Sequence, residues 1–189
     1  MLILSIDPGS KAHGVVLYDA GTERVVMSDK AKDSDGVFAL VAELRTVCHV
    51  RNVRGIVAVE RISPRQSMGG DVLLTAEWSA RFVQAAHDAG CDVYWLKRHA
   101  VLRELDLGGV AGNRDAAVRR AMIERHGPSK AEAVGRKASP GPLYGVSSHS
   151  WQALGLAVAA YEQNKRGQSP TITTGAMLGA VNEQEADHA

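Results

Sequence analysis

Three short apolar segments, separated only by tight turns, open the chain and constrain its fold more than any other feature. The first, residues 2–6 (LILSI), ends at Asp7-Pro8-Gly9; the second, 14–18 (GVVLY), ends at Asp19-Ala20-Gly21; the third spans 23–28. Asp, Pro and Gly at these places favour turns, and connections of this length join neighbouring antiparallel strands. The opening of the chain therefore predicts a three-stranded antiparallel meander.

An alternation of helices and strands follows the meander. Apolar residues recur at helical spacing after Ser34, which is the expected N-cap. The predicted elements are a helix over 34–50, a strand over 56–59, a helix over 71–89, a strand over 92–96, and helices to about 105, over 113–125 and over 147–161. Residues 127–142 are expected to form a mobile loop, because prolines and glycines interrupt any periodicity. This order predicts an α/β fold with a five-stranded mixed sheet, three strands antiparallel and two parallel, flanked by helices.

Length and composition bound the class of protein. The 189 residues fit one domain, which we expect over 1–163, followed by a polar and disordered tail over 164–189. No apolar run approaches the ~20 residues that cross a bilayer, and MLILSID is too short and too soon acidic for a signal peptide. The two cysteines, Cys48 and Cys91, form neither a disulfide framework nor a zinc cluster. We expect a cytoplasmic protein that does not bind membranes.

Two acidic residues stand directly after apolar strands. A right-handed crossover would place the strand over 56–59 parallel to the strand over 2–6, which brings Asp7 and Glu60 to one edge of the sheet. Ligands of α/β sheets favour the edge at the carboxyl ends of the strands. Two close carboxylates repel each other, and a hard divalent cation such as Mg²⁺ relieves that repulsion. The alternatives are a turn-forming Asp7 and a Glu60 that faces water at its strand end.

The last apolar helix carries polar residues near its start. His149 is followed three residues later by Gln152, and this spacing puts both on one face of a helix. A histidine at a helix start is more often a surface or capping residue than a ligand. Its neighbour Trp151 is expected to pack in the core.

Positive charge is concentrated in one stretch. Residues 97–137 contain 10 of the 22 Lys and Arg residues, against 5 of the 21 Asp and Glu residues. Such a block suits a polyanion partner. The other interpretation is a solvated helix face whose charges are balanced elsewhere.

These segments together resemble a known family. ILSIDPGSKAHGVVLYD resembles the first motif of the RuvC-type Holliday junction resolvases, and IVAVERI resembles their second. VYWLKRHAVLRELDLGGVAGNRDAAVRRAMIERHG is similar to the basic region of that family, and GPLYGVSSHSWQALGLAVAA to its closing helix, especially in phage-borne members. The resemblance covers about residues 2–161 in the family's order.

The resemblance implies an RNase H-like fold and a homodimer that acts on branched DNA, the four-way junction. It implies two Mg²⁺ ions per active site, replaceable by Mn²⁺, and hydrolysis of one phosphodiester on each of two opposed strands to leave 5′ phosphates. Asp7, Glu60 and His149 fall at catalytic positions of the family. As metal ligands it implies these three and, weakly, Gln152, which stands where many members have Asp. No nucleotide cofactor is expected, and the setting would be the cytoplasm of a bacterium or a phage-infected host.

Contacts with the DNA backbone are expected from the basic residues. The candidates are Arg61, Arg65, Lys97, Arg98, Arg103, Arg114, Arg136 and Lys137. Presentation of two sites to two strands would give selectivity for branched DNA. The helix over 71–89, with Trp78 and Phe82, is one candidate dimer surface, although core packing explains both aromatics equally well.

Three other functions remain open at this point. An actin-like ATPase or sugar kinase also has an Asp-Gly turn after its first strand, but it needs a second phosphate loop and a second domain. A branched-DNA-binding protein with weakened or lost catalysis fits the replacement of acids by His149 and Gln152. A different RNase H-like nuclease, acting on flaps or RNA–DNA hybrids, fits the same fold.

Overall fold

The computed structural model describes residues 1–62 and 69–173 of the chain. Its main sheet has five strands in the order β3-β2-β1-β4-β5. The strands are β1 (Leu2–Asp7), β2 (His13–Asp19), β3 (Arg24–Ala31), β4 (Gly55–Arg61) and β5 (Asp92–Lys97). β1, β2 and β3 pair antiparallel, and β4 pairs parallel with both β1 and β5. The predicted mixed sheet is confirmed.

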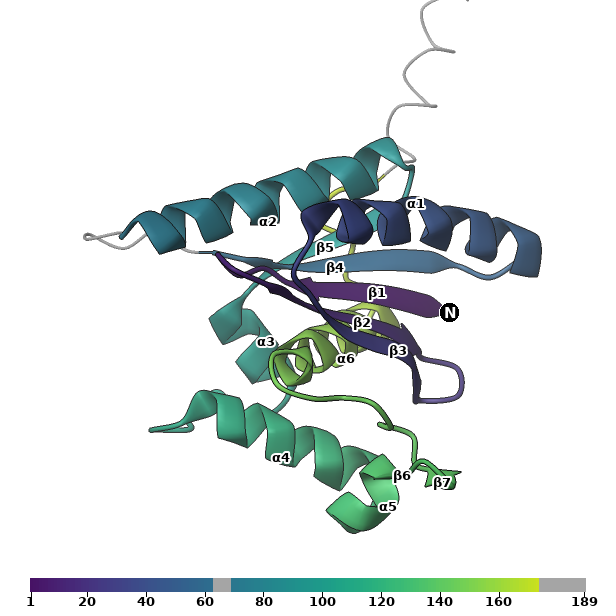
Figure 1. Cartoon of the computed structure of the whole chain (residues 1–189), viewed down its shortest axis with the longest axis vertical. Helices are drawn as coiled ribbons and strands as arrows, with labels where there is room; N and C mark the ends of the chain where they lie inside the picture. The colour runs from purple at the N-terminus through teal and green to yellow at the C-terminus, as the bar shows by residue number, and fades with distance from the viewer. Residues whose placement is uncertain (63–68, 174–189) are drawn as a thin grey trace, which may run out of the picture.

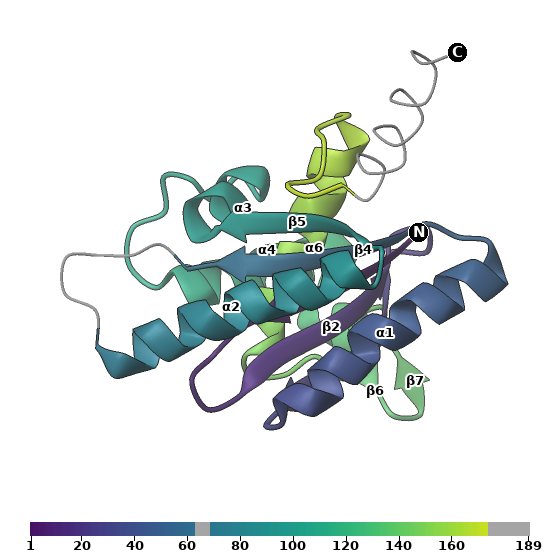
Figure 2. The same cartoon turned by 90° about the horizontal axis from the view of Figure 1, so that it is seen from above.

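Helices cover both faces of this sheet (Figures 1 and 2). They are α1 (Ser34–Arg51), α2 (Gly70–Asp88), α3 (Arg98–Glu104), α4 (Arg114–His126), α5 (Lys130–Val134) and α6 (Ser150–Lys165). α1 and α2 lie on one face and α6 lies on the other, with α3 beside α6 and with α4 and α5 farther from the sheet (Figure 1). Among the described residues, no helix combines the length and apolarity that crossing a membrane requires.

The sequence of β1 explains this layering. Side chains alternate across a strand, so Leu4 and Ile6 pack toward α1 and α2, whereas Ile3 packs toward α6. A strand buried on both faces is apolar throughout. α6 is also buried almost all round, because the sheet covers one side of it and α3 and α4 cover the other. Phe82 of α2 is fully buried, as core packing requires.

The start of α1 differs from the prediction. The N-cap is Asp33, whose Oδ1 accepts a hydrogen bond from the Asp35 N–H at 3.0 Å. Ser34 is the first helical residue, and its hydroxyl instead pairs with His13 Nε2 at 3.0 Å. A partner from β2 therefore occupies the side chain that the sequence pattern assigned to capping.

The stretch 127–142 is not an irregular loop throughout. Ser129 caps α5, because its hydroxyl oxygen accepts a hydrogen bond from the Glu132 N–H and donates to the Glu132 carboxylate. Ser129 therefore satisfies a free backbone N–H in the first turn of α5. The two short strands β6 (Gly135–Arg136) and β7 (Ser139–Pro140) then form a hairpin.

The region after residue 163 also begins with ordered structure. α6 continues to Lys165, past the expected domain end. The Tyr94 hydroxyl donates a hydrogen bond to the Gln168 carbonyl at 2.9 Å, and Ile172 exchanges two backbone hydrogen bonds with Val93. Residues 164–173 thus run back to the outer edge of β5. The rest of the expected tail, 174–189, lies outside the described residues.

Candidate active site

Strand pairing brings the two predicted acids together at the carboxyl edge of β1 and β4. Ile6 lies opposite Val59 in the parallel ladder, so Asp7 and Glu60 follow at the same level of the sheet. The two carboxyls are close enough for the negative charge of Glu60 to raise the pKa of Asp7. The expectation that the crossover would juxtapose these residues is confirmed. Two carboxyls held this close disfavour the charged form of Asp7 while no cation is present.

The surroundings raise the pKa of Asp7 well above its ordinary value. Burial is the largest cause, because desolvation disfavours the charged carboxylate. The negative charge of Glu60 acts in the same direction, and Asp115 adds a smaller effect of the same sign. The positive charge of Arg98 opposes them. Asp7 is therefore costly to ionise in the metal-free protein.

This raised pKa predicts how stability depends on pH without metal. Below the ordinary pKa of 3.8, Asp7 is protonated in the folded and unfolded chains, and it costs nothing. As pH rises from that value toward the folded-state pKa, the unfolded chain releases the proton first, so the free energy of unfolding decreases. We expect Asp7→Asn to become increasingly more stable than the wild type over this range. Urea unfolding in EDTA at several pH values measures the difference in free energy of unfolding between the two proteins. A difference that does not change with pH would contradict a raised pKa for Asp7.

The start of α6 lies against the acidic edge. Gly14 is the antiparallel partner of Asp7. A Cβ on Gly14 would lie 2.7 Å from the backbone oxygen of His149, so the backbone of α6 makes its close approach at the level of Asp7. His149 itself is exposed, and its side chain does not cap the helix. Residues 7, 60 and 149 thus gather at one end of the sheet.

Gln152 is more buried than the sequence pattern suggests. Its side chain is 9% exposed, and its amide nitrogen donates to the Asp115 carbonyl at 3.4 Å. Its amide oxygen is buried without a hydrogen-bond partner among the described residues. An unpaired buried acceptor is costly, so this oxygen is suited to a donor or a cation that binds there.

Asp115 is a member of the site that the sequence analysis missed. It stands in the first turn of α4, and the guanidinium of Arg98 joins it to the acid pair. Arg98 Nη1 lies 3.6 Å from Glu60 Oε2, and its Nη2 hydrogen-bonds to Asp115 Oδ1. Arg98, predicted to contact DNA, is thus engaged with two acids. Spacing could not reveal this, because nothing in the pattern sets how α4 lies beside α3.

A hydrogen-bond chain holds the backbone of Glu60. The buried hydroxyl of Ser79, on α2, donates to the Glu60 carbonyl at 2.6 Å. Trp95 Nε1 in turn donates to the Ser79 hydroxyl at 2.8 Å. The indole also lies under the guanidinium of Arg61, 4.7 Å from the ring centre. Ser79 of α2 therefore holds the backbone of Glu60, and Trp95 of β5 holds the guanidinium of Arg61.

The predicted DNA-binding cations do not all share one surface. Arg61 and Lys97 are exposed register partners, one residue past the level of Glu60. Arg114 is exposed at the start of α4, beside Asp115, and Arg103 is exposed on α3. Arg65 lies outside the described residues.

Arg136 and Lys137 lie elsewhere. They belong to the β6–β7 hairpin, which is tied to the start of β3: the Val25 N–H donates to the Pro142 carbonyl at 2.8 Å. The start of β3 is at the opposite end of the sheet from Asp7, and Figure 1 shows the hairpin far from α3. The structure does not bring this pair to the acids.

A large groove runs along α4 to the start of α6. Its volume is about 1030 Å³, and its lining joins the α4 face to the start of α6. Asp115, His149 and Gln152 line it together with the cationic side chains Arg119, Arg120 and Lys130. Arg119 lies over the ring of the buried Trp151, 5.4 Å from its centre. The groove therefore joins Asp115 and the start of α6 to three cationic side chains, whereas Asp7 and Glu60 are not among its lining residues.

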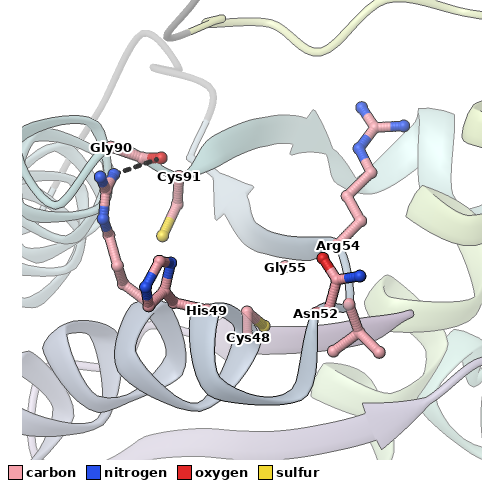
Figure 3. A pocket seen from close by; sticks show the side chains of 9 residues that line it. Cys48, His49, Asn52, Arg54, Gly55, Gly90 and Cys91 are labelled. Atoms are coloured by element: carbon pink, nitrogen blue, oxygen red, sulfur yellow. Dashed lines mark hydrogen bonds between the residues drawn. The ribbon is translucent and has the colours of Figure 1, made fainter.

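A second hollow lies at the other end of the parallel strands. It has a volume of about 410 Å³, and Cys48, His49 and Cys91 are among its lining residues (Figure 3). Both arginines there are engaged: Arg45 donates to the carbonyls of Ala89 and Gly90, and Arg54 pairs with Asp92. The two cysteines are buried and free. The chemistry-bearing residues thus favour the acidic edge as the functional site.

The donor set at the acidic edge suits a hard cation with few protein ligands. The two carboxylates are oxygen donors that Mg²⁺ prefers, and the unpaired amide oxygen of Gln152 is a further candidate that lies in the groove with Asp115 and His149. Among residues 1–62 and 69–173, no three His, Cys, Asp or Glu side chains are grouped closely enough to hold a metal ion. A cation here would need water or substrate oxygens to complete its shell.

Comparison with known proteins gives a structural match only. No family model and no curated protein matches the sequence. The fold resembles that of RuvC from Thermus thermophilus, with a TM-score of 0.56 and 21% identity over 90% of this chain and 99% of that one. The same protein in complex with a Holliday junction substrate gives a TM-score of 0.57 and 19% identity over the same shares. The fold is therefore RNase H-like and matches that of RuvC.

Proposed function

We propose that this protein is a metal-dependent endonuclease that resolves four-way DNA junctions. The observation that carries the proposal is the acid pair Asp7 and Glu60, one of them buried with a raised pKa, at the carboxyl edge of a RuvC-like sheet. The relative of similar fold was solved with a Holliday junction substrate. Each active site would nick one strand and leave a 5′ phosphate.

Asp7 and Glu60 would hold the Mg²⁺, or the Mn²⁺ that replaces it. Gln152 and His149 are the further candidates, since both line the groove along α4. A bound divalent cation supplies an activated water and charge stabilisation at the departing 3′ oxygen. The protein contributes the positions of the donors: β1 and β4 fix the acids, and the Ser79 hydroxyl fixes the Glu60 backbone. With so few acids, the scissile phosphate must supply part of the negative charge, and metal affinity without DNA should be weak.

The cations near the acids would bind the DNA backbone. Arg61 and Lys97 lie at the ends of β4 and β5, one residue past the level of Glu60, Arg114 begins α4, and Arg119 and Arg120 line the groove. Lys and Arg bind phosphate and release condensed counterions. These contacts position a strand without reading its sequence.

A dimer is part of the proposal, because two opposed strands require two sites. The candidate surface is the first half of α2, where Val72, Leu73 and Leu74 are all exposed. Trp78 is no longer a strong candidate for that surface, since it packs against Phe82, His13 and Phe38. Sedimentation of the full chain measures the oligomeric state.

A junction-binding protein without cleavage is the second candidate. Gln152 favours it, because an amide stands where the resemblance implies a carboxylate, and no third acid adjoins the pair as a ligand among the described residues. The fold and the cations serve this function equally well. Only the chemistry separates the two.

One substrate panel tests the proposal. Purified protein is incubated with a four-way junction, linear duplex, flap and RNA–DNA hybrid, in Mg²⁺, Mn²⁺ or EDTA. We expect symmetric nicks in the junction that require the metal and carry 5′ phosphates. Tight junction binding without any nick would favour the second candidate. Cleavage of flaps or hybrids in preference to junctions would indicate a different RNase H-like nuclease.

Salt dependence tests which cations contact the DNA. Each neutralised phosphate contributes about −0.9 to the slope of log K against log[salt] for duplex arms. We expect Arg61→Gln and Lys97→Gln each to reduce the magnitude of the slope by about that amount, measured by junction binding of Asp7→Asn in EDTA. Arg136→Gln is the matched control at the opposite end of the sheet, and it should leave the slope unchanged. An equal change in the slope for Arg136→Gln would contradict the proposed DNA-binding surface.

A further inference from the structure

Arg98 is the one cation that the structure shows bound directly to the acid pair among the described residues. It is the first residue of α3, and its side chain is 28% exposed while that of Glu60 is 14% exposed. One guanidinium nitrogen faces Glu60 at 3.6 Å, and the other binds Asp115, which is 70% exposed. The Arg98 side chain thus bridges Glu60, which is mostly buried, and Asp115, which is exposed.

We propose that Arg98 competes with the metal for Glu60. The guanidinium pairs with Glu60 while no metal is bound, and it moves toward Asp115 when the metal binds. The inference deepens the proposed function and rests on it, because it takes Asp7 and Glu60 to be the metal ligands.

Charge and geometry carry the inference. Arg98 pairs with both Glu60 and Asp115, and among the described residues no other cation forms an ion pair with either of them. The positive charge of Arg98 also acts on Asp7. It lowers the pKa of that carboxyl, whereas burial and the charge of Glu60 raise it. A planar guanidinium has enough donors to bind two carboxylates at once. A divalent cation at Glu60 would repel Arg98, and the bond with Asp115 already provides the place to which it can turn.

Asp115 would then act through Arg98 and not as a ligand. Its carboxylate is occupied by the guanidinium, and its backbone carbonyl accepts from Gln152. It would be a positioning residue that weakens the competition between Arg98 and the metal. Removing Arg98 and removing Asp115 should therefore have opposite effects on metal binding.

Titration of Mn²⁺ alone into the full-length protein, without DNA, tests this by calorimetry or by the spin resonance of free Mn²⁺. We expect Arg98→Gln to tighten Mn²⁺ binding by about three- to tenfold and Asp115→Asn to weaken it by a similar factor. In the Arg98→Gln background, Asp115→Asn should have no further effect. Glu124→Gln, another exposed acid on α4, is the matched control and should leave the affinity unchanged.

Three outcomes would overturn the inference. In the first, Arg98→Gln leaves the Mn²⁺ affinity the same or weakens it. In the second, Asp115→Asn weakens binding equally with and without Arg98, which makes Asp115 a ligand. In the third, neither the wild type nor Arg98→Gln binds Mn²⁺, which removes the proposed metal site as well. Mn²⁺ binding that Asp7→Asn abolishes and Arg98→Gln does not change overturns this inference alone. Should Arg98→Gln fail to fold, Arg98→Lys replaces it: a single ammonium cannot bridge both acids, so the effect of Asp115→Asn should shrink in that background.

Discussion

Asp7→Asn is expected to abolish junction cleavage while junction binding persists. The substitution removes a carboxylate from a two-acid site, and the loss of metal-assisted stabilisation of several kcal/mol lowers the rate by roughly a thousandfold or more. Binding should be retained, because the candidate phosphate contacts come from Arg61, Lys97 and α4 and not from β1. Single-turnover cleavage and a binding titration on the same junction separate the two effects.

The same variant should be at least as stable as the wild type in EDTA. An asparagine amide carries no charge to bury beside Glu60, and its NH₂ group can donate a hydrogen bond. Lower stability would indicate that the loss of cleavage reflects unfolding. A rate within a few-fold of the wild type, with the fold intact, would falsify the assignment of Asp7 as a metal ligand.

The acid pair was predictable because it depends on local patterns. Each acid directly follows an apolar strand, and the handedness of the crossover sets β4 parallel beside β1. Register then places Asp7 and Glu60 at one level without any knowledge of the helices. The five-stranded order follows from the same two rules.

The surroundings of the pair were not predictable in the same way. Arg98 and Asp115 are brought together by the packing of α3 and α4 outside α6, and the sequence between them, with its glycines, carries no periodicity that sets this packing. An arginine in a basic block is indistinguishable from a phosphate contact until its partners are known. For the same reason, charge density alone could not place Arg136 at the far end of the sheet.

The error at 127–142 has a local origin. Prolines and glycines indicated a mobile loop, yet Ser129 followed three residues later by Glu132 has the sequence spacing of a helix start, and Ser129 caps α5. Because α5 has only 5 residues, it is too short to show a helical pattern of apolar residues. The capping residues were the only signal available.

Gly14→Ala should separate the contribution of α6 from that of the acid pair. The added Cβ would lie 2.7 Å from the His149 oxygen and 2.9 Å from its carbonyl carbon. Backbone atoms cannot rotate away as a flexible side chain can, so the start of α6 must shift away from β2. We expect a loss of about 1–3 kcal/mol in the free energy of unfolding. The cleavage rate should fall roughly a hundredfold, because a displacement of about 1 Å suffices for such a loss.

Asp7 and Glu60 stay on their own strands in this variant, so Mn²⁺ binding should change little while cleavage falls. Gly36→Ala is the matched control: its Cβ would meet only Asp33 Oδ2 at 3.9 Å, and alanine within a helix adds about 0.5–1 kcal/mol of stability. If the shift acts through His149, then His149→Ala should cost much less in the Gly14→Ala background than in the wild type. Wild-type cleavage by Gly14→Ala would mean that the start of α6 takes no part in the reaction, and that two acids alone do the chemistry.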